Sequence, residues 1–260
     1  MIGGNPALNE NTFDLSYDLP DEQVMTMEGT VAKSAVLVGL TVTAAAVTWG
    51  ITTAGGVFDA AAAMPWLFGG AIGGLILALI TIFSPKKAPV TAPLYAIFEG
   101  LFLGAISAWY EASFGAGAQG ASAGMLSGIV VQAAGLTFSV LAVMLILYAT
   151  RIIRVTEKLR AGIIAATGAV VVFYVAAMVL RLFGMNMPFL NSPSPLGIGI
   201  SLVIVGIAAF NLLLDFDLIE RGCKQGSPKY MEWYAGFSLL VTLVWLYLEI
   251  LRLLSKLRSR

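Results

Sequence analysis

The side chains with the clearest potential for chemistry are carboxylic acids that lie inside or beside long apolar runs. They are Glu99, Asp215, Asp217 and Glu249. An ionised side chain at the centre of a bilayer costs roughly 2.5–3.5 kcal/mol on insertion scales, and such residues are usually functional. Carboxylate oxygens suit hard cations such as Ca²⁺, and burial alters how readily they take up a proton. The acids are therefore candidates for ion binding or for proton-dependent gating.

Glu99 and Glu249 each have a structural alternative to a functional role. Glu99 has no Lys or Arg three or four residues away, so it must be neutral, pair with another helix or face a water cavity. A protonated carboxyl bonded to a backbone carbonyl is the structural alternative, and we favour function. Glu249 precedes Arg252 by three residues, so a local ion pair is the alternative to a gating or ion-binding carboxylate.

Asp217, Glu232 and Arg252 are secondary candidates. Asp215 and Asp217 are two residues apart and point to different faces of a helix, so at most one of them faces a bundle interior. Asp217 can meet cytoplasmic water or Arg221, and we prefer the role of an ordinary polar helix end. Glu232 has aromatic and basic neighbours where the last apolar run begins, so we expect a mainly structural interfacial anchor.

The residues that the chain lacks argue against several classes of chemistry. It has no histidine and a single cysteine, so a serine or cysteine hydrolase has no usual base and a zinc site lacks ligands. No glycine-rich phosphate loop precedes Lys-Ser or Lys-Thr, so ATP use is not supported. An intramembrane aspartyl protease needs two interior aspartates on separate helices, whereas the aspartates within or bordering an apolar run here share one helix end. We expect no enzyme, no cofactor and no resident metal. Basic and acidic residues balance at 15 each, which gives no reason to expect a nucleic-acid partner.

Membrane-spanning helices must position these acids. The chain is 58% hydrophobic and 12% charged, whereas soluble domains carry about 25% charged residues. Seven apolar runs are each long enough to cross ~30 Å of hydrocarbon as a helix. They are Ala35–Thr53, Met64–Phe83, Val90–Trp109, Met125–Thr150, Leu159–Phe183, Leu196–Phe216 and Trp233–Leu254. The sequence predicts an all-α polytopic protein, a seven-transmembrane helical bundle embedded in the lipid bilayer.

The basic residues of the loops indicate an orientation. Three alternate loops hold nine of them, namely Lys86, Lys87, Arg151, Arg154, Lys158, Arg160, Arg221, Lys224 and Lys229. The intervening loops Ala54–Ala63, Glu111–Gly124 and Gly184–Pro195 hold none, and basic loops tend to stay in the cytoplasm. We therefore expect a cytoplasmic N-terminus. The basic C-terminal tail would then lie outside, unless the last run does not cross fully; we favour full crossing.

The chain divides into a tail and a membrane domain. Residues 1–30 hold six acidic and no basic residues, and we expect a disordered cytoplasmic tail there. Residues 31–260 form the membrane domain. Glycines four residues apart let helices approach closely, and we expect packing within one chain, with a dimer face as the alternative. These repeats are Gly69 with Gly73, Gly70 with Gly74, Gly100 with Gly104, and Gly124 with Gly128.

Several stretches of the sequence are similar to a known family. They are Ala92–Gly104 (APLYAIFEGLFLG), Leu214–Gly222 (LDFDLIERG), Lys229–Tyr234 (KYMEWY) and Leu243–Leu254 (LVWLYLEILRLL). Together they resemble the bacterial Bax inhibitor-like membrane proteins of the transmembrane Bax inhibitor motif family, over roughly residues 30–257. The resemblance implies a seven-helix fold with the last helix central, wrapped by the other six, in a bacterial plasma (inner) membrane.

The resemblance also implies a pH-sensitive calcium leak. Two carboxylates of the last two helices pair at acidic to neutral pH and open the pore when they separate; carried over by motif, they are Asp215 and Glu249. This sequence departs in having Glu where relatives commonly have Asp, and in a longer connection. In a simple antiparallel hairpin turning near Gly222–Pro228, Asp215 lies about 10 Å and Glu249 roughly 30 Å from the turn. They meet only if Pro228–Tyr234 forms an interfacial segment before the last helix turns inward.

A second class of function stays open beside the leak of calcium or other cations. The protein can instead be a membrane interaction protein that binds and modulates other membrane machinery, such as a protease, without conducting ions. This alternative predicts that removing charges leaves function intact, whereas changes to lipid-facing or glycine-rich surfaces abolish it. A transporter with inverted repeats is the weakest reading, because the two halves show no convincing similarity.

Overall fold

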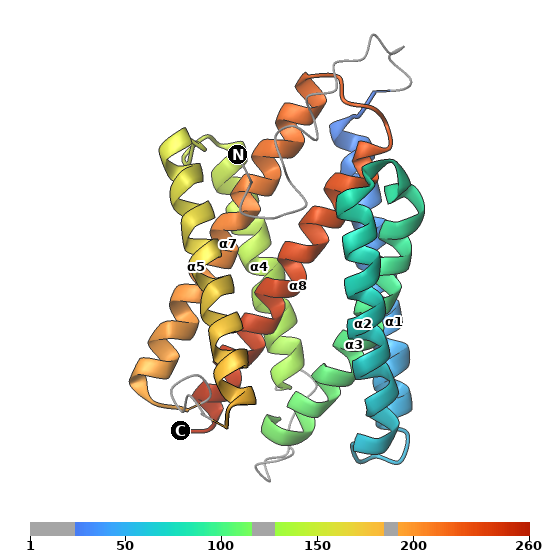
Figure 1. The fold of residues 1–260 in the computed structure, drawn as a ribbon, viewed down its shortest axis with the longest axis vertical. Coiled ribbons are helices and arrows are strands. Elements are labelled where there is room, and N and C mark those ends of the chain that lie inside the picture. The colour runs from blue at the N-terminus through green and yellow to red at the C-terminus, as the bar shows by residue number, and fades with distance from the viewer. Residues whose placement is uncertain (1–23, 116–127, 185–191) are drawn as a thin grey trace.

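The computed structural model describes residues 24–115, 128–184 and 192–260, which form seven long helices and one short 3₁₀ helix (Figure 1). The elements are α1 (Met27–Thr52), α2 (Ala60–Phe83), η3 (Pro85–Lys87), α3 (Ala88–Phe114), α4 (Ile129–Ala149), α5 (Glu157–Leu182), α7 (Pro195–Lys224) and α8 (Met231–Arg258). Each of the seven long helices is long and apolar enough to cross a membrane. The predicted all-α fold with seven spans is confirmed.

Helix α7 extends well beyond its apolar run, and this changes the place of two candidate residues. It continues for eight residues past Phe216, to Lys224. The expectation that Asp215 and Asp217 end this helix is therefore wrong. The buried face of α7 persists through its last turns, and Glu220 forms an ion pair of 2.6 Å with Lys224 one turn later, which stabilises the extension.

Helix α1 begins eight residues before its apolar run. Its N-cap is Thr26, whose hydroxyl accepts a hydrogen bond of 3.0 Å from a backbone N–H of the first turn. The N–H of Met25 donates to the carbonyl of Ser227 at 2.6 Å, so this end of the chain is tied to the α7–α8 connection. Residues 24–30 of the expected tail are thus part of the fold, whereas residues 1–23 lie outside the described ranges.

Helix α8 joins two groups of helices. It packs against α1 and α3 and also against α4 and α7, and Figure 1 shows it crossing between these groups. Its side chains belong to both apolar cores: Phe237 lies with Leu37 and Tyr95, and Leu246 lies with Leu212. Helix α2 packs mainly on α3. The stronger expectation, six helices wrapped around the last one, stays a prediction.

Glycines allow α1 and α3 to approach closely. A Cβ atom at Gly100 would clash with the backbone of Thr41, and one at Gly104 would clash with the backbone of Ala45. Packing within one chain is therefore confirmed as the role of this repeat. Gly124 lies outside the described residues, and the dimer alternative stays a prediction.

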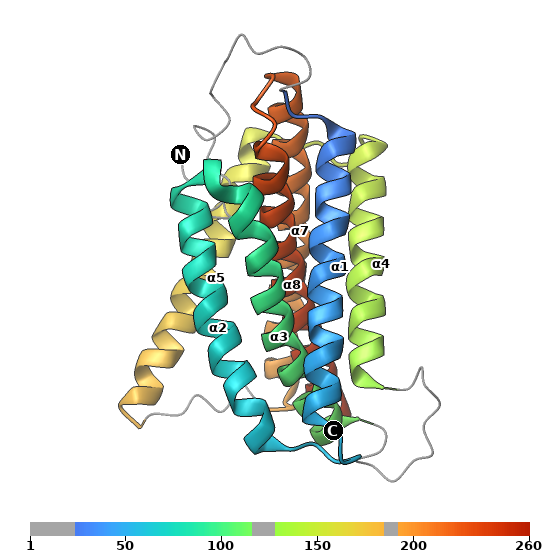
Figure 2. The same cartoon turned by 90° about the vertical axis from the view of Figure 1, so that its right-hand side faces the viewer.

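The basic loops lie at one end of the bundle, and the C-terminus lies at the other. The α2–α3, α4–α5 and α7–α8 connections share one end in both views, and α8 runs away from it (Figures 1 and 2). Basic residues at the far end of α8 have partners inside the protein. Lys256 Nζ donates to Gly197 O at 2.9 Å and to Ser201 Oγ at 2.8 Å, and Arg258 Nη2 donates to Gln132 Oε1 at 2.9 Å. These contacts account for basic side chains at the end where the loops carry none.

Candidate functional site

Polar side chains form a row between α5, α7 and α8. On α8 they are four and then seven residues apart, on α7 four apart and on α5 seven apart, so each set shares one helix face. We call this set the polar row: Thr167, Tyr174, Asn211, Asp215, Ser238, Thr242 and Glu249. Tyr174 is half-buried and the other six are buried, so the row runs through the interior of the bundle.

Asp215 faces the bundle interior from α7. The residue is 1% exposed, and Ser238 Oγ of α8 donates a hydrogen bond to its Oδ1 at 3.4 Å. Asp217 points instead toward α5, where Arg160 Nη2 lies 2.7 Å from its Oδ2. The expected contact of Asp217 with Arg221 is also present, at 3.0 Å. As expected, the two aspartates take different faces, and Asp215 is the one that faces inward.

Glu249 is enclosed between α5 and α8. The residue is 3% exposed, and the Tyr174 hydroxyl of α5 donates to its Oε1 at 2.8 Å. Arg252 Nη1 lies 3.1 Å from the same oxygen and 3.2 Å from Oε2, so the local ion pair is confirmed. The guanidinium of Arg252 also donates to the Tyr174 hydroxyl, lies 5.1 Å from the ring centroid and interacts with Tyr110 of α3. Glu249 therefore links helices as well as pairing locally.

The structure does not bring Asp215 and Glu249 together. Ser238, which contacts Asp215, precedes Glu249 by eleven residues on α8, a separation of about 16 Å at 1.5 Å per residue. The cause is the α7–α8 connection, in which Gly226 takes a φ of 68° and α8 already begins at Met231. Because no interfacial segment shifts the last helix, the direct carboxylate pair that the resemblance implies is not formed.

Neutral polar groups occupy the interval between the two acids. Asn211 lies one turn from Asp215, and its Nδ2 donates to Thr167 Oγ1 of α5 at 2.8 Å. Thr242 lies on the same face of α8 between Ser238 and Glu249 and is buried. The two carboxylates therefore lie at separate positions along the polar row, with neutral polar side chains between them.

Glu99 lies outside the polar row. It is half-buried on α3 and faces α2, where a Cβ atom added to Gly74 would lie 3.1 Å from its Oε2. Tyr95, one turn earlier on α3, hydrogen-bonds to the Glu99 carboxyl. These described neighbours are a phenol and a glycine, so the contacts around Glu99 are uncharged, unlike those around Glu249.

A second charged cluster ties α7 to α4 and α5 at the basic end. Glu220 Oε1 of α7 lies 2.5 Å from Arg151 Nη2, and the Tyr148 hydroxyl of α4 donates to its other oxygen. The hydrogen bond to the Glu220 carboxylate raises the pKa of the exposed Arg151 guanidinium above its ordinary value. With the Asp217–Arg160 ion pair, this cluster holds three helices together. Sequence reasoning missed Glu220, because its spacing to Lys224 indicates only a local ion pair and its partners Arg151 and Tyr148 are about 70 residues away.

Glu232, at the start of α8, is buried against the start of α1. The residue is 0% exposed, and its Oε1 accepts hydrogen bonds from Thr26 N at 3.0 Å and from Thr26 Oγ1 at 2.9 Å. Lys33 Nζ lies 3.2 Å from its other oxygen. The burial arises because α1 starts early and covers this end of α8, whereas the position of Glu232 relative to the membrane interface stays a prediction. The structural role remains, since Glu232 anchors the start of α1.

The carboxylates of the polar row stand apart from one another. Within the described parts of the chain, no three His, Cys, Asp or Glu side chains come together as a metal-binding group. Asp215 is contacted by Ser238, and Glu249 by Tyr174 and Arg252. A cation in the row would meet one carboxylate at a time, with neutral polar groups between, and weak sites in series favour passage over retention.

Comparison with known proteins identifies a family. The family model described as Bax inhibitor 1 like matches residues 5–259, nearly the whole chain. The match confirms the resemblance, and with the seven apolar helices it fits an integral membrane protein. Searches of curated proteins and of solved structures find no significant match.

Proposed function

The chain belongs to the Bax inhibitor 1 like family, and from that premise we propose that it is a pH-sensitive cation leak, with calcium as the cation that the resemblance implies. In this proposal the cation moves along the polar row between α5, α7 and α8. Protonation of Asp215 and Glu249 closes the path. The basic end of the bundle and the N-terminus face the cytoplasm of a bacterium, across its inner membrane.

The polar row is the observation that carries the proposal. Asp215 lies nine residues before the end of α7 at Lys224, and Glu249 lies nine residues before the end of α8 at Arg258. At 1.5 Å per residue, Asp215 is therefore about 14 Å from the basic end of the bundle, and Glu249 is about 14 Å from the opposite end. Two acids at different depths, joined by neutral polar side chains, divide the crossing into shorter steps.

The contacts of the two acids give the sign of the pH dependence. When Glu249 is ionised it neutralises Arg252, and ionised Asp215 attracts cations at the other depth. When the pH falls and both acids take up protons, Asp215 loses this attraction and Arg252 loses its counter-ion. An unneutralised guanidinium beside the path repels cations. The flux should therefore fall as the pH falls.

Calcium flux into liposomes that contain the purified protein and a trapped calcium indicator tests the proposal. Asp215→Asn and Glu249→Gln should each lower the flux at neutral pH, because each removes one of the two carboxylates along the path. The matched control is Asp217→Asn, the same chemical change on α7 outside the polar row, which should keep the flux of the unaltered protein. Unaltered flux and pH profile in both test variants would count decisively against the leak.

A second candidate function is the binding of a membrane-protein partner. The observation that favours it is the outward position of Gly69 on α2, where an added Cβ would meet no atom within 4 Å. A bare glycine on a lipid-facing helix lets another helix approach. Gly69→Leu should abolish co-purification of such a partner, whereas Asp215→Asn should not. Retained co-purification in Gly69→Leu would remove this candidate.

A further inference from the structure

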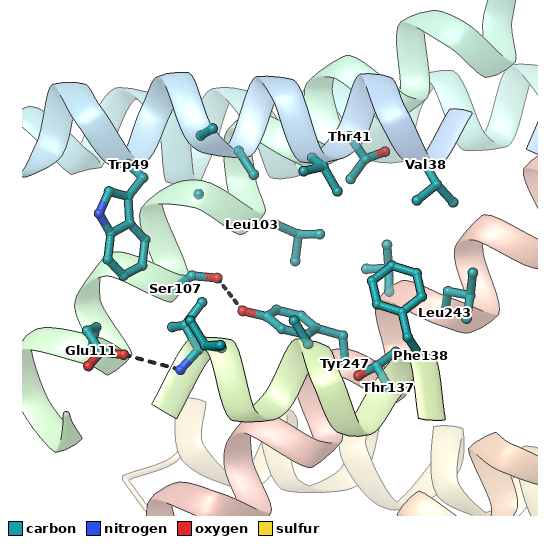
Figure 3. Close-up of a pocket in the computed structure, with 18 of the residues that line it drawn as sticks. Val38, Thr41, Trp49, Leu103, Ser107, Glu111, Thr137, Phe138, Leu243 and Tyr247 are labelled. Atoms are coloured by element: carbon teal, nitrogen blue, oxygen red, sulfur yellow. Dashed lines mark hydrogen bonds between the residues drawn. The ribbon is translucent and has the colours of Figure 1, made fainter. Parts of the chain in front are cut away.

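A groove of about 680 Å³ lies between α1, α3, α4 and α8, on the side of α8 that faces away from Glu249. Figure 3 shows Tyr247 of α8 pointing into it between α1 and α4. The rim is formed by exposed side chains of α1 and α4, such as Val42 and Phe138. Since both helices are membrane-spanning, the groove opens sideways to the lipid.

The floor of the groove is apolar and its polar groups are already satisfied. Leu243 and Val244 of α8 form part of it and are only 6–7% exposed, so the groove is narrow at its base. Ser107 Oγ and Tyr247 Oη share a hydrogen bond of 2.7 Å. The Thr137 hydroxyl donates to its own helix at 2.8 Å. The groove thus offers little to water or to an ion and much to hydrocarbon.

The two ends of the groove differ in character. Along α1 it runs from Val38 to Trp49, eleven residues or about 16 Å, which is half of a ~30 Å hydrocarbon core. Trp49 and Glu111 lie at one end of the groove (Figure 3). This end is opposite the basic loops, because α1 starts beside the α7–α8 connection and Trp49 lies in its last turn. Val130 N–H of α4 donates to the Glu111 carboxylate there at 3.2 Å. Tryptophan is typical of the boundary between hydrocarbon and headgroups.

We propose that this groove binds one acyl chain of a membrane phospholipid, with the headgroup beside Trp49 and Glu111. The groove has the length of one leaflet, is apolar along that length and becomes polar at the membrane surface, which is the pattern of a phospholipid. A partner helix is about 10–12 Å wide with its side chains. Such a helix could rest on the rim of the groove, but it is too wide to contact Leu243 and Val244 at the narrow base.

The bound chain would contact α8 directly behind the polar row. Tyr247 lines the groove and Glu249, two residues later, contacts Tyr174 on the other side of the helix. The proposal of lipid binding is argued only from the groove and does not depend on ion conduction by the polar row. Its test therefore reads lipid contact and not flux.

A photoreactive phospholipid with a diazirine near the middle of one acyl chain tests the proposal. The full-length protein is reconstituted with it, irradiated, and the labelled residues are located by mass spectrometry. The expected result is labelling of Leu243, Val244 or Tyr247, the residues of α8 that line the groove at this level. Ala134→Trp fills the groove from α4, and Ala46→Trp narrows it from the exposed rim of α1. Each should lower labelling of α8 at least fivefold.

The matched control is Leu136→Trp, on the lipid-facing side of α4 outside the groove, which should leave the labelling of α8 unchanged. Circular dichroism of each variant checks the helical fold, and the exposed position of Ala46 keeps one blocking variant available if Ala134→Trp does not fold. Labelling confined to outward-facing residues would overturn the proposal. So would labelling of Leu243, Val244 and Tyr247 that both groove variants leave intact.

Discussion

Replacing Glu249 and Arg252 separately and together by glutamine tests whether their contact is an enclosed ion pair. The nitrogen and oxygen atoms are 3.1 Å apart, which corresponds to an attraction of about 5 kcal/mol at an effective dielectric constant of 20. The two sides of the pair are not equivalent, because the Glu249 side chain is 3% exposed and that of Arg252 is 32% exposed. An enclosed charge that loses its partner costs more than one that can reach water.

Arg252→Gln should therefore be the more harmful change. It leaves Glu249 as an enclosed carboxylate without its cation and should cost roughly 3–5 kcal/mol. Glu249→Gln leaves a guanidinium that keeps part of its hydration and the face of Tyr174, and it should cost about 1–2 kcal/mol. The double variant should be more stable than the sum of the two losses indicates.

Thermal unfolding of the purified protein in one detergent, at neutral pH, measures these differences. A loss of 1 kcal/mol lowers Tm by roughly 2–4 °C in a domain of this size, so Arg252→Gln should lower it by on the order of 10 °C. The control is Arg258→Gln, which removes a guanidinium near the same end of α8 that donates to the Phe114 carbonyl and to the Gln132 amide oxygen. Equal losses for Glu249→Gln and Arg252→Gln, or strictly additive losses in the double variant, would refute the reasoning.

Three further substitutions probe the packing and the anchoring of the helices. Gly104→Ala should destabilise the protein because its Cβ meets the α1 backbone, whereas Gly39→Ala, with open space around it, should stabilise it by about 0.5–1 kcal/mol; equal Tm changes would be contrary to this. Glu232→Gln should speed amide hydrogen exchange in the first turn of α1, and unchanged exchange there would show that the anchor is unimportant. Lys256→Met should lower Tm by several degrees through the loss of two hydrogen bonds to α7, a result that an unchanged Tm would contradict.

The number of helices and their order follow from the sequence because each apolar run is a local property. The ends of the helices do not, since a polar turn extends a helix when it finds partners elsewhere. Thr26 illustrates this: it starts α1 early and its partner is Glu232, 206 residues away. For the same reason the burial of Glu232 could not be predicted from its neighbours.

The candidate site was accessible from the sequence only in part. Asp215 and Glu249 stand out as acids in apolar runs, and the ion pair with Arg252 follows from spacing. The partner Tyr174 lies on another helix, 75 residues away, and no local pattern indicates it. The spacing of Ser238, Thr242 and Glu249 in the sequence places them on one helix face, and this pattern could have predicted the polar row on α8. Helix geometry predicted that Asp215 and Glu249 lie far apart in a simple hairpin, as they do in the structure. The family motif implied instead that the two carboxylates pair.

The pH profile of calcium flux in liposomes, measured for the unaltered protein and for Glu249→Gln under the same membrane potential, tests the central claim most directly. In the proposal the ionised acids open the path and their protonation closes it, so the unaltered protein should conduct more at high pH than at low pH. Glu249→Gln should conduct less at pH 8 and show a flatter profile. Identical rising profiles for the two proteins, or no flux above that of empty liposomes, would contradict the account.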